Sequence, residues 1–180
     1  MSFRLETERL VLREWQETDS AAFHAMCNDP RVMQFLGPAM SHQDIDAALD
    51  RQRGFQRDHG YCFWAMERRG DGAFLGFCGI KPGREGTPLQ GHAEIGWRLA
   101  HHAWGKGYAK EAAQACLDWG FGEFRIGDIR AMTVPGNVRS WGLMERLGME
   151  RQTELDFDHP ALAPGDPLRP HIVYRKLAQQ

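Results

Sequence analysis

The chain has 180 residues, of which 42% are hydrophobic and 26% charged, and its formal net charge is −2 at pH 7. This is the composition of a globular protein with a sizeable core. The near-neutral charge does not indicate binding to nucleic acid or to an anionic membrane, and we expect neither partner. The length suits one domain and no Pro-, Gly- or Ser-rich linker divides it, so residues 1–180 are predicted to form a single domain.

The first ten residues, MSFRLETERL, mix both signs of charge and lack the apolar stretch of a secretion signal. No apolar run in the sequence approaches the roughly 18 residues that a membrane span needs. We therefore expect a cytoplasmic protein.

Cysteine and histidine spacing does not indicate a metal site. The four cysteines are scattered, without a C-x-x-C pair, and are expected to be ordinary buried thiols. Among the eight histidines, His101 and His102 are adjacent, so their side chains diverge in a strand or helix. The H-E-x-x-H motif is absent, and we expect no metal.

The first half of the chain begins with an alternating segment, RLVLREW at residues 9–15, which predicts a half-buried strand. Residues 18–20, Thr-Asp-Ser, then offer helix caps for the apolar segment AAFHAMC. A second helix is predicted from Ser41 to about Gly60, because a cap at its start precedes spaced apolar residues.

Three strands follow in close order, at residues 61–68, 73–81 and 92–100, all rich in aromatic and aliphatic side chains. Short Gly-containing segments join them, which indicates antiparallel neighbours.

The second half contains a helix within residues 101–121, a strand at 129–134, a helix at about 138–147, and strands at 149–157 and 171–177 with a Pro-rich loop between them. The sequence thus predicts an α/β (α+β) fold with a mixed, mainly antiparallel sheet of six to seven strands and about four helices. One parallel crossover is expected to pass through residues 101–121.

Two glycines, Gly105 and Gly107, lead directly into the alanine-rich helix of this crossover, and no Ser, Thr, Asp or Asn precedes it as a cap. The first backbone amides of such a helix are unpaired, and together with the helix dipole they favour a phosphate group. The alternative is a turn whose amides are hydrated. The P-loop and dinucleotide patterns are not met, because Gly107 follows Lys106 and Lys110 occupies the third glycine position.

Four motifs in order carry a family resemblance: TERLVLREW, AEIGWRL, AWGKGYAKEA and NVRSWGLMERLGM. The chain resembles the GNAT superfamily of acetyl-CoA dependent N-acetyltransferases over roughly Thr7 to Met149. It looks most like the branch that acetylates the N-termini of ribosomal proteins. His102 stands where the superfamily signature more often has Arg or Gln.

The resemblance implies a fold and a coenzyme A site. The fold would be the mixed GNAT sheet, and the pantetheine arm would pair with the backbone edge at Trp97 and Leu99. Asn137 would hydrogen-bond this arm, although an Asn before a helix is also a favoured cap. The pyrophosphate would be bound by backbone amides around Ala103, Gly105, Lys106, Gly107 and Tyr108.

Acetyl transfer from a thioester requires a neutral amine. At pH 7 only about one lysine in two thousand is neutral, against about one α-amine in ten, so a base is useful. Glu94 is the candidate base, acting through a water, because strand alternation places it on one face with Gly96 and Arg98. Relatives often carry a Glu at this point. The alternative is a solvated Glu on an exposed sheet face.

The leaving thiolate, with a pKa near 8.5, benefits from a proton donor without requiring one. Met144 stands seven residues after Asn137, where many relatives have a Tyr, and it cannot donate. Ser140 is the nearest candidate donor, and it could instead satisfy local backbone amides. Tyr108 and Tyr174 remain alternatives. A free N–H near residues 97–99 is expected to stabilise charge on the carbonyl oxygen.

The prediction is an N-acetyltransferase that uses acetyl-CoA as cosubstrate and transfers the acetyl group directly. Cys78 lies within a predicted strand and Cys116 within a predicted helix, so neither is expected to be a nucleophile. The acceptor is a primary amine, either a protein N-terminus or a small molecule, and a homodimer is compatible with the sequence. The alternative is a non-catalytic CoA-binding or regulatory module with the same fold.

Overall fold

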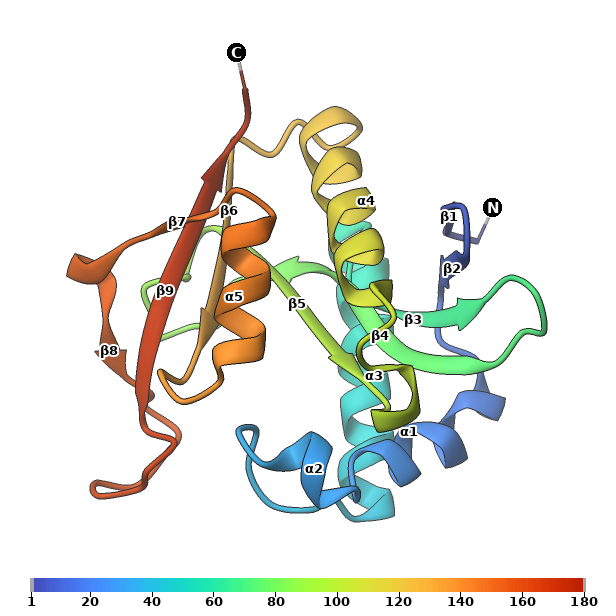
Figure 1. Cartoon of the computed structure of the whole chain (residues 1–180), viewed down its shortest axis with the longest axis horizontal. Helices are drawn as coiled ribbons and strands as arrows, with labels where there is room; N and C mark the ends of the chain where they lie inside the picture. Colours follow the sequence, from blue (N-terminus) through green and yellow to red (C-terminus); the bar gives the residue numbers. More distant parts are fainter. Residues whose placement is uncertain (1, 180) are drawn as a thin grey trace.

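A nine-stranded twisted sheet with five α-helices forms the structure, a computed structural model that describes residues 2–179 (Figure 1). The strands are β1 (Arg4–Glu6), β2 (Leu10–Arg13), β3 (Phe63–Arg68), β4 (Phe74–Pro82), β5 (Ala93–Leu99), β6 (Asp128–Thr133), β7 (Glu150–Arg151), β8 (Phe157–Asp158) and β9 (Pro170–Leu177). The helices are α1 (Ser20–Met26), α2 (Pro30–Met33), α3 (His42–His59), α4 (Tyr108–Gly122) and α5 (Val138–Arg146). The sheet order is β1-β2-β3-β4-β5-β6-β9-β7, and β8 pairs with β9.

All neighbouring strands are antiparallel except β5 and β6. The short connections between β3, β4 and β5 account for their antiparallel pairing, as predicted. The β5–β6 pair is parallel because α4 carries the chain back across the sheet, which confirms the predicted crossover.

The parallel pair is also where the sheet opens. β5 and β6 pair only at Ala93 with Ile129 and at Glu94 with Arg130. Beyond Glu94 the two strands diverge, with α4 and α5 on the two sides of the gap (Figure 1). The second half of β5 therefore has one paired edge, toward β4, and one open edge.

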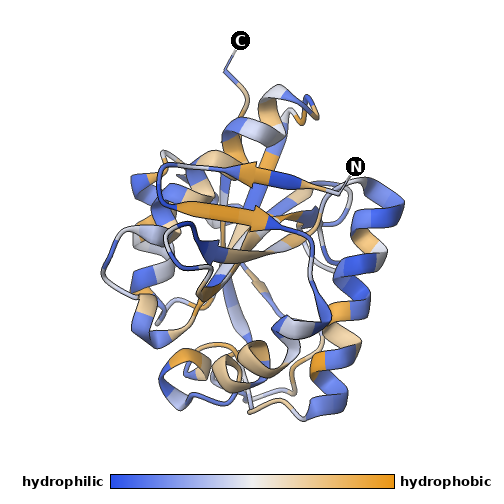
Figure 2. Cartoon of the chain, turned by 90° about the vertical axis from the view of Figure 1, so that its right-hand side faces the viewer, coloured by the Kyte–Doolittle hydropathy of each residue, from blue (hydrophilic) through white to orange (hydrophobic). Residues whose placement is uncertain are grey.

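Two apolar clusters cover the two faces of the sheet. On one face Ile95 and Leu99 of β5 pack into the cluster that includes α4. On the other face Phe63 and Phe77 pack with residues of α1, α2 and α3. Figure 2 shows the apolar colours concentrated along the strands, while the long helix α3 is mainly hydrophilic outside. Because side chains alternate along a strand, residues 94, 96 and 98 of β5 lie on the face of the sheet that carries Phe63 and Phe77.

The fold class is confirmed, and the differences from prediction concern short elements. The prediction of one continuous strand at 149–157 is wrong. The structure has two short strands there, β7 and β8, and a 3-10 turn at Thr153–Leu155 separates them. The four-residue helix α2 was not predicted; it begins at Pro30 behind an Asp29 cap and is too short to show helical periodicity. β1 spans three residues and was also not predicted.

In residues 2–179 no helix is long and apolar enough to cross a membrane. Across the same range, no three His, Cys, Asp or Glu side chains gather closely enough to hold a metal ion.

Candidate functional site

The start of α4 carries a run of unpaired backbone amides. Gly105 and Gly107 have φ angles of 73° and 81°, a left-handed conformation that glycine adopts readily, and no side chain caps the helix. The first hydrogen bond of the helix is from the Glu111 N–H to the Gly107 carbonyl, at 3.1 Å. Within residues 2–179 the amides of residues 105–110 donate to no protein acceptor. Together with the helix dipole, these donors form a site for an anion.

Arg9, from the turn between β1 and β2, holds this loop from outside. Its Nη1 donates to the Lys106 carbonyl at 3.0 Å and its Nε to the Glu111 carboxylate at 2.7 Å. Its guanidinium lies 4.8 Å from the centre of the Tyr108 ring. The Thr7 hydroxyl also donates to Glu111, at 2.6 Å. Arg9 was not predicted from the sequence, because about a hundred residues separate it from the loop.

Ala103 does not belong to the set of free amides. Its N–H donates to the Ala100 carbonyl at 2.9 Å, in a short 3-10 turn, and the residue is buried. Trp104 anchors the same loop, because its indole N–H donates to the Leu99 carbonyl at 2.8 Å. From the other side of the gap, the guanidinium of Arg139 lies 4.9 Å from the Trp104 ring centre. The loop is thus fixed on both sides of the opening.

The open edge of β5 presents backbone donors and acceptors. The Ala100 N–H bonds the Leu75 carbonyl at 2.9 Å, toward β4. Because backbone groups alternate along a strand, those of Trp97 and Leu99 point toward the gap. The Leu99 carbonyl accepts from Trp104 there. The remaining groups are placed to pair with an extended chain.

The start of α5 lies across the gap from β5. Asn137 occupies the cap position of α5, yet its side chain makes no capping hydrogen bond. Its backbone carbonyl accepts from the amides of Ser140, at 3.0 Å, and Trp141, at 3.2 Å. Within residues 2–179 the Ser140 hydroxyl has no hydrogen-bond partner. The purely structural roles considered for these two side chains are therefore not observed.

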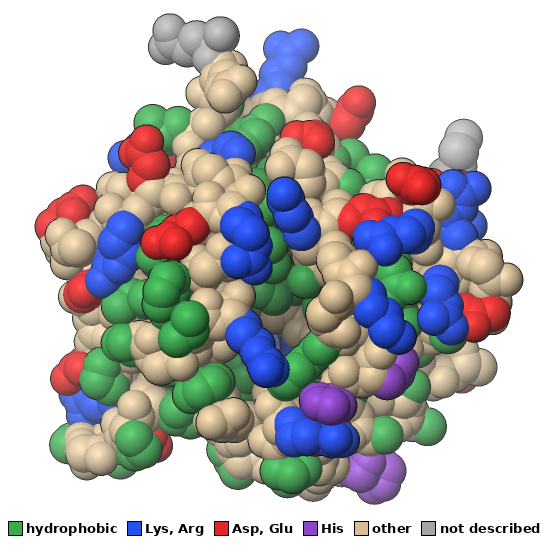
Figure 3. Space-filling model, viewed as in Figure 1, with side chains coloured by type: hydrophobic (Ala, Val, Ile, Leu, Met, Phe, Trp, Pro, Cys, Tyr) green, Lys and Arg blue, Asp and Glu red, His purple; other side chains and the backbone are tan. Residues whose placement is uncertain are grey.

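Figure 3, in the same view as Figure 1, shows a hollow near the centre of this face of the molecule. Lys and Arg side chains surround the hollow. An anionic ligand would be attracted to such a rim.

Glu94 is buried and forms an ion pair. The residue is 7% exposed, and its Oε2 lies 2.5 Å from the Lys81 Nζ on β4. Oε1 receives no hydrogen bond from residues 2–179 and keeps contact with solvent. The lysine was not identified from the sequence, because it depends on the register of β4 against β5. One oxygen of Glu94 is thus held by Lys81 and the other is available.

Of the two tyrosines considered as proton donors, Tyr174 has its hydroxyl engaged elsewhere. The Tyr174 hydroxyl donates to the Glu145 carboxylate at 3.2 Å, and burial and then Glu145 raise the pKa of this phenol. The Tyr108 ring lies against the Arg9 guanidinium, 4.8 Å from its centre, and its hydroxyl makes no hydrogen bond within residues 2–179.

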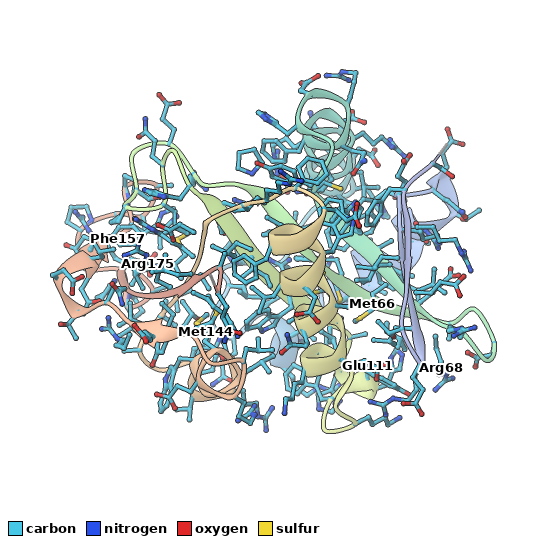
Figure 4. The ribbon with its side chains drawn as sticks, turned by 90° about the horizontal axis from the view of Figure 1, so that it is seen from above. Met66, Arg68, Glu111, Met144, Phe157 and Arg175 are labelled. Carbon is cyan, nitrogen blue, oxygen red and sulfur yellow. The ribbon has the colours of Figure 1, made fainter. Side chains whose placement is uncertain are left out.

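Met144 is 2% exposed and belongs to the core. In Figure 4 it lies with α5, while Glu111 and Met66 lie on the far side, with α4 and β3. It therefore contributes apolar packing to the core and cannot donate a proton.

All four cysteines are free and buried. Burial raises the pKa of the Cys27, Cys62 and Cys116 thiols. A buried neutral thiol is a weak nucleophile, and this favours a reaction without a covalent cysteine intermediate.

Residues 9–150 match the family described as an acetyltransferase (GNAT) domain. The chain is 36% identical over 147 residues to the uncharacterised protein YkkB of Bacillus subtilis (strain 168), covering 81% of this chain and 84% of that protein. It is 31% identical over 149 residues to the uncharacterised N-acetyltransferase YnaD of the same strain, covering 82% and 83%. A solved GNAT-family acetyltransferase from Bacillus anthracis superposes with a TM-score of 0.80 at 25% identity, covering 99% and 100%.

Proposed function

Because this chain belongs to the GNAT acetyltransferase family, we propose that it transfers the acetyl group of acetyl-CoA directly to a primary amine. The observation that carries the proposal is the uncapped start of α4, with six unpaired amides beside the opening between β5 and β6. We treat residues 1–180 as one such domain. Acetyl-CoA, when bound, supplies an activated acetyl thioester.

The residues of the gap fit this cosubstrate. The amides of Gly105, Lys106, Gly107 and Tyr108 would bind the pyrophosphate, as unpaired donors at a helix start do. The edge of Trp97 and Leu99 would pair with the pantetheine arm in the manner of an added strand. The Asn137 side-chain amide, which caps nothing, would hydrogen-bond the same arm.

Glu94 is the proposed base. Its Oε1 receives no hydrogen bond from the described residues and would take the proton of the amine through a water, while Lys81 holds Oε2. An unpaired N–H on the open edge near Trp97 would stabilise the negative charge that develops on the carbonyl oxygen.

Ser140 is the proposed partner of the leaving sulfur. Its hydroxyl has no protein partner in the described residues, whereas the Tyr174 hydroxyl donates to Glu145; Tyr108 stays the alternative donor. A hydroxyl that only hydrogen-bonds a thiolate gives a modest gain, because a thiolate is a good leaving group. We expect a loss of about tenfold in kcat for Ser140→Ala.

The branch and the acceptor are proposed from the motifs. The segments AEIGWRL, WGKGYA and NVRSW look most like those of the branch that acetylates ribosomal-protein N-termini. An α-amine is also the easier acceptor, since about one in ten is neutral at pH 7. Small-molecule amines remain the second acceptor class.

The proposed function is tested by CoA release and mass-shift detection with a panel of peptides and small amines. Glu94→Gln keeps the size of the side chain and removes its basicity, so kcat/KM should fall by about a hundredfold at pH 7. Unchanged rates from pH 6 to 9 would exclude Glu94 as the base.

The cofactor site is tested separately by calorimetry. CoA should bind more tightly than dephosphorylated pantetheine, because only CoA carries the pyrophosphate. Equal affinities would remove the loop from the proposed site.

A further inference from the structure

Arg98 is a half-buried cation without a carboxylate partner. It lies on β5, on the same face as Glu94, and its guanidinium lies 5.5 Å from the Phe77 ring centre. Its Nη1 contacts two sulfur atoms, those of Cys27 at 3.1 Å and Met40 at 3.9 Å. Its Nε is buried and has no hydrogen-bond partner in residues 2–179. A desolvated charge in such surroundings is unfavourable unless another group neutralises it.

The other half-buried arginines of the described chain show how unusual this is. Each has an Asp or Glu oxygen within 4 Å, and Arg98 alone has none. The paired residues are Arg13, Arg68, Arg130, Arg151, Arg169 and Arg175. The fold therefore supplies a counterion wherever an arginine is partly withdrawn from water, except on this face of β5.

The side of the Arg98 guanidinium that has no partner is the side that binds carboxylates. Nε and Nη2 lie along one edge and donate in parallel, and both Arg31 with Asp29 and Arg68 with Asp71 use this edge. In Arg98 the sulfur contacts involve Nη1 alone. Nη2 has no partner among residues 2–179 and is not enclosed. A carboxylate can therefore reach this edge at Nη2, whereas Nε is enclosed by the protein.

The neighbouring sulfur atoms do not neutralise the charge. Burial raises the pKa of the Cys27 thiol, with Arg98 opposing this as a smaller effect, so Cys27 is uncharged at neutral pH. The Met40 thioether is always uncharged. Both are weak acceptors and leave a net positive charge.

The position of Arg98 relates this charge to the acceptor. Gly96 and Glu94 precede it on the same face, at about 7 and 13 Å along the strand. Gly96 leaves room for the Phe63 ring, since a Cβ there would come within 2.6 Å of it. The Phe63 ring fills the space over Gly96, so the acceptor would approach the thioester along the open edge at Trp97 and Leu99. Arg98 stands between these two residues, so an amine that reaches the thioester would have its guanidinium several bonds away.

We propose that Arg98 binds a carboxylate of the acceptor, so that the preferred acceptor is a primary amine carrying a carboxylate several bonds from its nitrogen. This rests on the proposed acetyl transfer and narrows its substrate class. Arg98 would act as a specificity determinant, with the carboxylate of the acceptor supplying the counterion that the chain lacks.

The test uses the full-length protein, acetyl-CoA and matched pairs of acceptors that differ in one carboxylate. The pairs are lysine with 1,5-diaminopentane, γ-aminobutyrate with butylamine, and the peptide amide Ala-Glu-Ala with Ala-Gln-Ala. The first two represent free amino acids and the third a protein N-terminus. We expect kcat/KM to favour the carboxylate in at least one pair by tenfold or more, mainly through KM.

Three variants test whether Arg98 causes the preference for the acceptor with the carboxylate. In Arg98→Met the ratio within the preferred pair should fall below about two. In Arg98→Lys it should be intermediate, because the charge stays while the position of the donor group changes. Arg57→Gln, an exposed arginine on α3 that pairs with Asp58, removes the same charge elsewhere and should leave the ratio unchanged. The proposal would be overturned if the wild-type protein had a kcat/KM ratio near one in all pairs. It would also be overturned if Arg98→Met kept the wild-type ratio.

A binding measurement separates this inference from the proposed function. Calorimetry compares Nε-acetyl-lysine with N-acetyl-1,5-diaminopentane on the CoA-loaded protein, and requires no turnover. A tenfold preference for the carboxylate that Arg98→Met abolishes supports the anion subsite even if no amine is acetylated. Equal affinities would overturn the subsite even if acetyl transfer is observed.

Discussion

Two helix starts in this protein are built in opposite ways. At α3, the Ser41 hydroxyl accepts the Asp44 amide at 3.1 Å, and the Asp44 carboxylate accepts the Ser41 amide at 2.9 Å. At α4, Gly107 offers no side chain, and the amides before and within the first turn have no protein partner. The first start is completed by its own residues, whereas the second leaves its amides free to bind an anion.

Two arginines repeat the contrast. Arg13 is bound through Nη1 and Nη2 to Asp19 and through Nε to Glu67, with distances of 2.8 to 2.9 Å. Arg98 has no carboxylate within 4 Å among the described residues. Both arginines are half-buried, so the difference lies in their counterions. Polar groups that are satisfied within the chain stabilise the fold, and those left open mark where another molecule is expected to bind.

The largest effect is expected for Arg13→Met. The change leaves Asp19 and Glu67 without their shared counterion, and the free energy of unfolding should fall by about 3 kcal/mol. Urea unfolding measures this. Arg53→Met removes an arginine from an exposed pair with Asp50 and should change stability by less than about 0.5 kcal/mol. Equal losses in the two variants would contradict the distinction between the sites.

The next effect concerns the open helix start. Gly105→Val should raise the Kd for CoA about 30-fold, because a side chain and a strained backbone would disturb the free amides. Calorimetry measures the affinity. Gly72→Val is the matched control: its φ is 69° against 73° for Gly105, and neither has a neighbour within 4 Å of an added Cβ. Similar losses of CoA affinity would show that backbone strain, rather than the loop, is responsible.

A smaller effect is expected at the closed helix start. Ser41→Ala removes the cap of α3 and should lower the free energy of unfolding by about 1 kcal/mol, with a fall of roughly 2–4 °C in Tm. CoA affinity should not change, because α3 does not contribute to the gap between β5 and β6. A weaker CoA affinity in this variant would mean that the two helix starts are coupled.

The smallest effect has the opposite sign. Arg98→Met replaces an unpaired charge by an apolar side chain among Cys27, Met40 and Phe77, so Tm should rise by roughly 2–4 °C. Thermal unfolding without ligands measures it. A clear fall in Tm would mean that the arginine serves the fold, and it would weaken the contrast with Arg13.

Local patterns predicted most of the fold. The glycine-bounded strands β3 to β5, the capped helix α3 and the crossover through α4 were all predicted, because alternation, caps and short turns act within a few residues. The break between β7 and β8 was not, since both are two-residue strands that exist through pairing with β9. The short helix α2 escaped prediction for a similar reason, as one turn shows no period.

The site divides in the same way. The sequence by itself determined the uncapped glycine loop, the alternation of Glu94 with Arg98, and the Asn137 and Ser140 pair, because each depends on neighbours in the chain. Only the tertiary structure decided that Lys81 holds Glu94, that Arg9 contacts the loop, and that Arg98 has no counterion among residues 2–179. These depend on strand register and on segments far apart in the sequence, whose proximity no local pattern encodes.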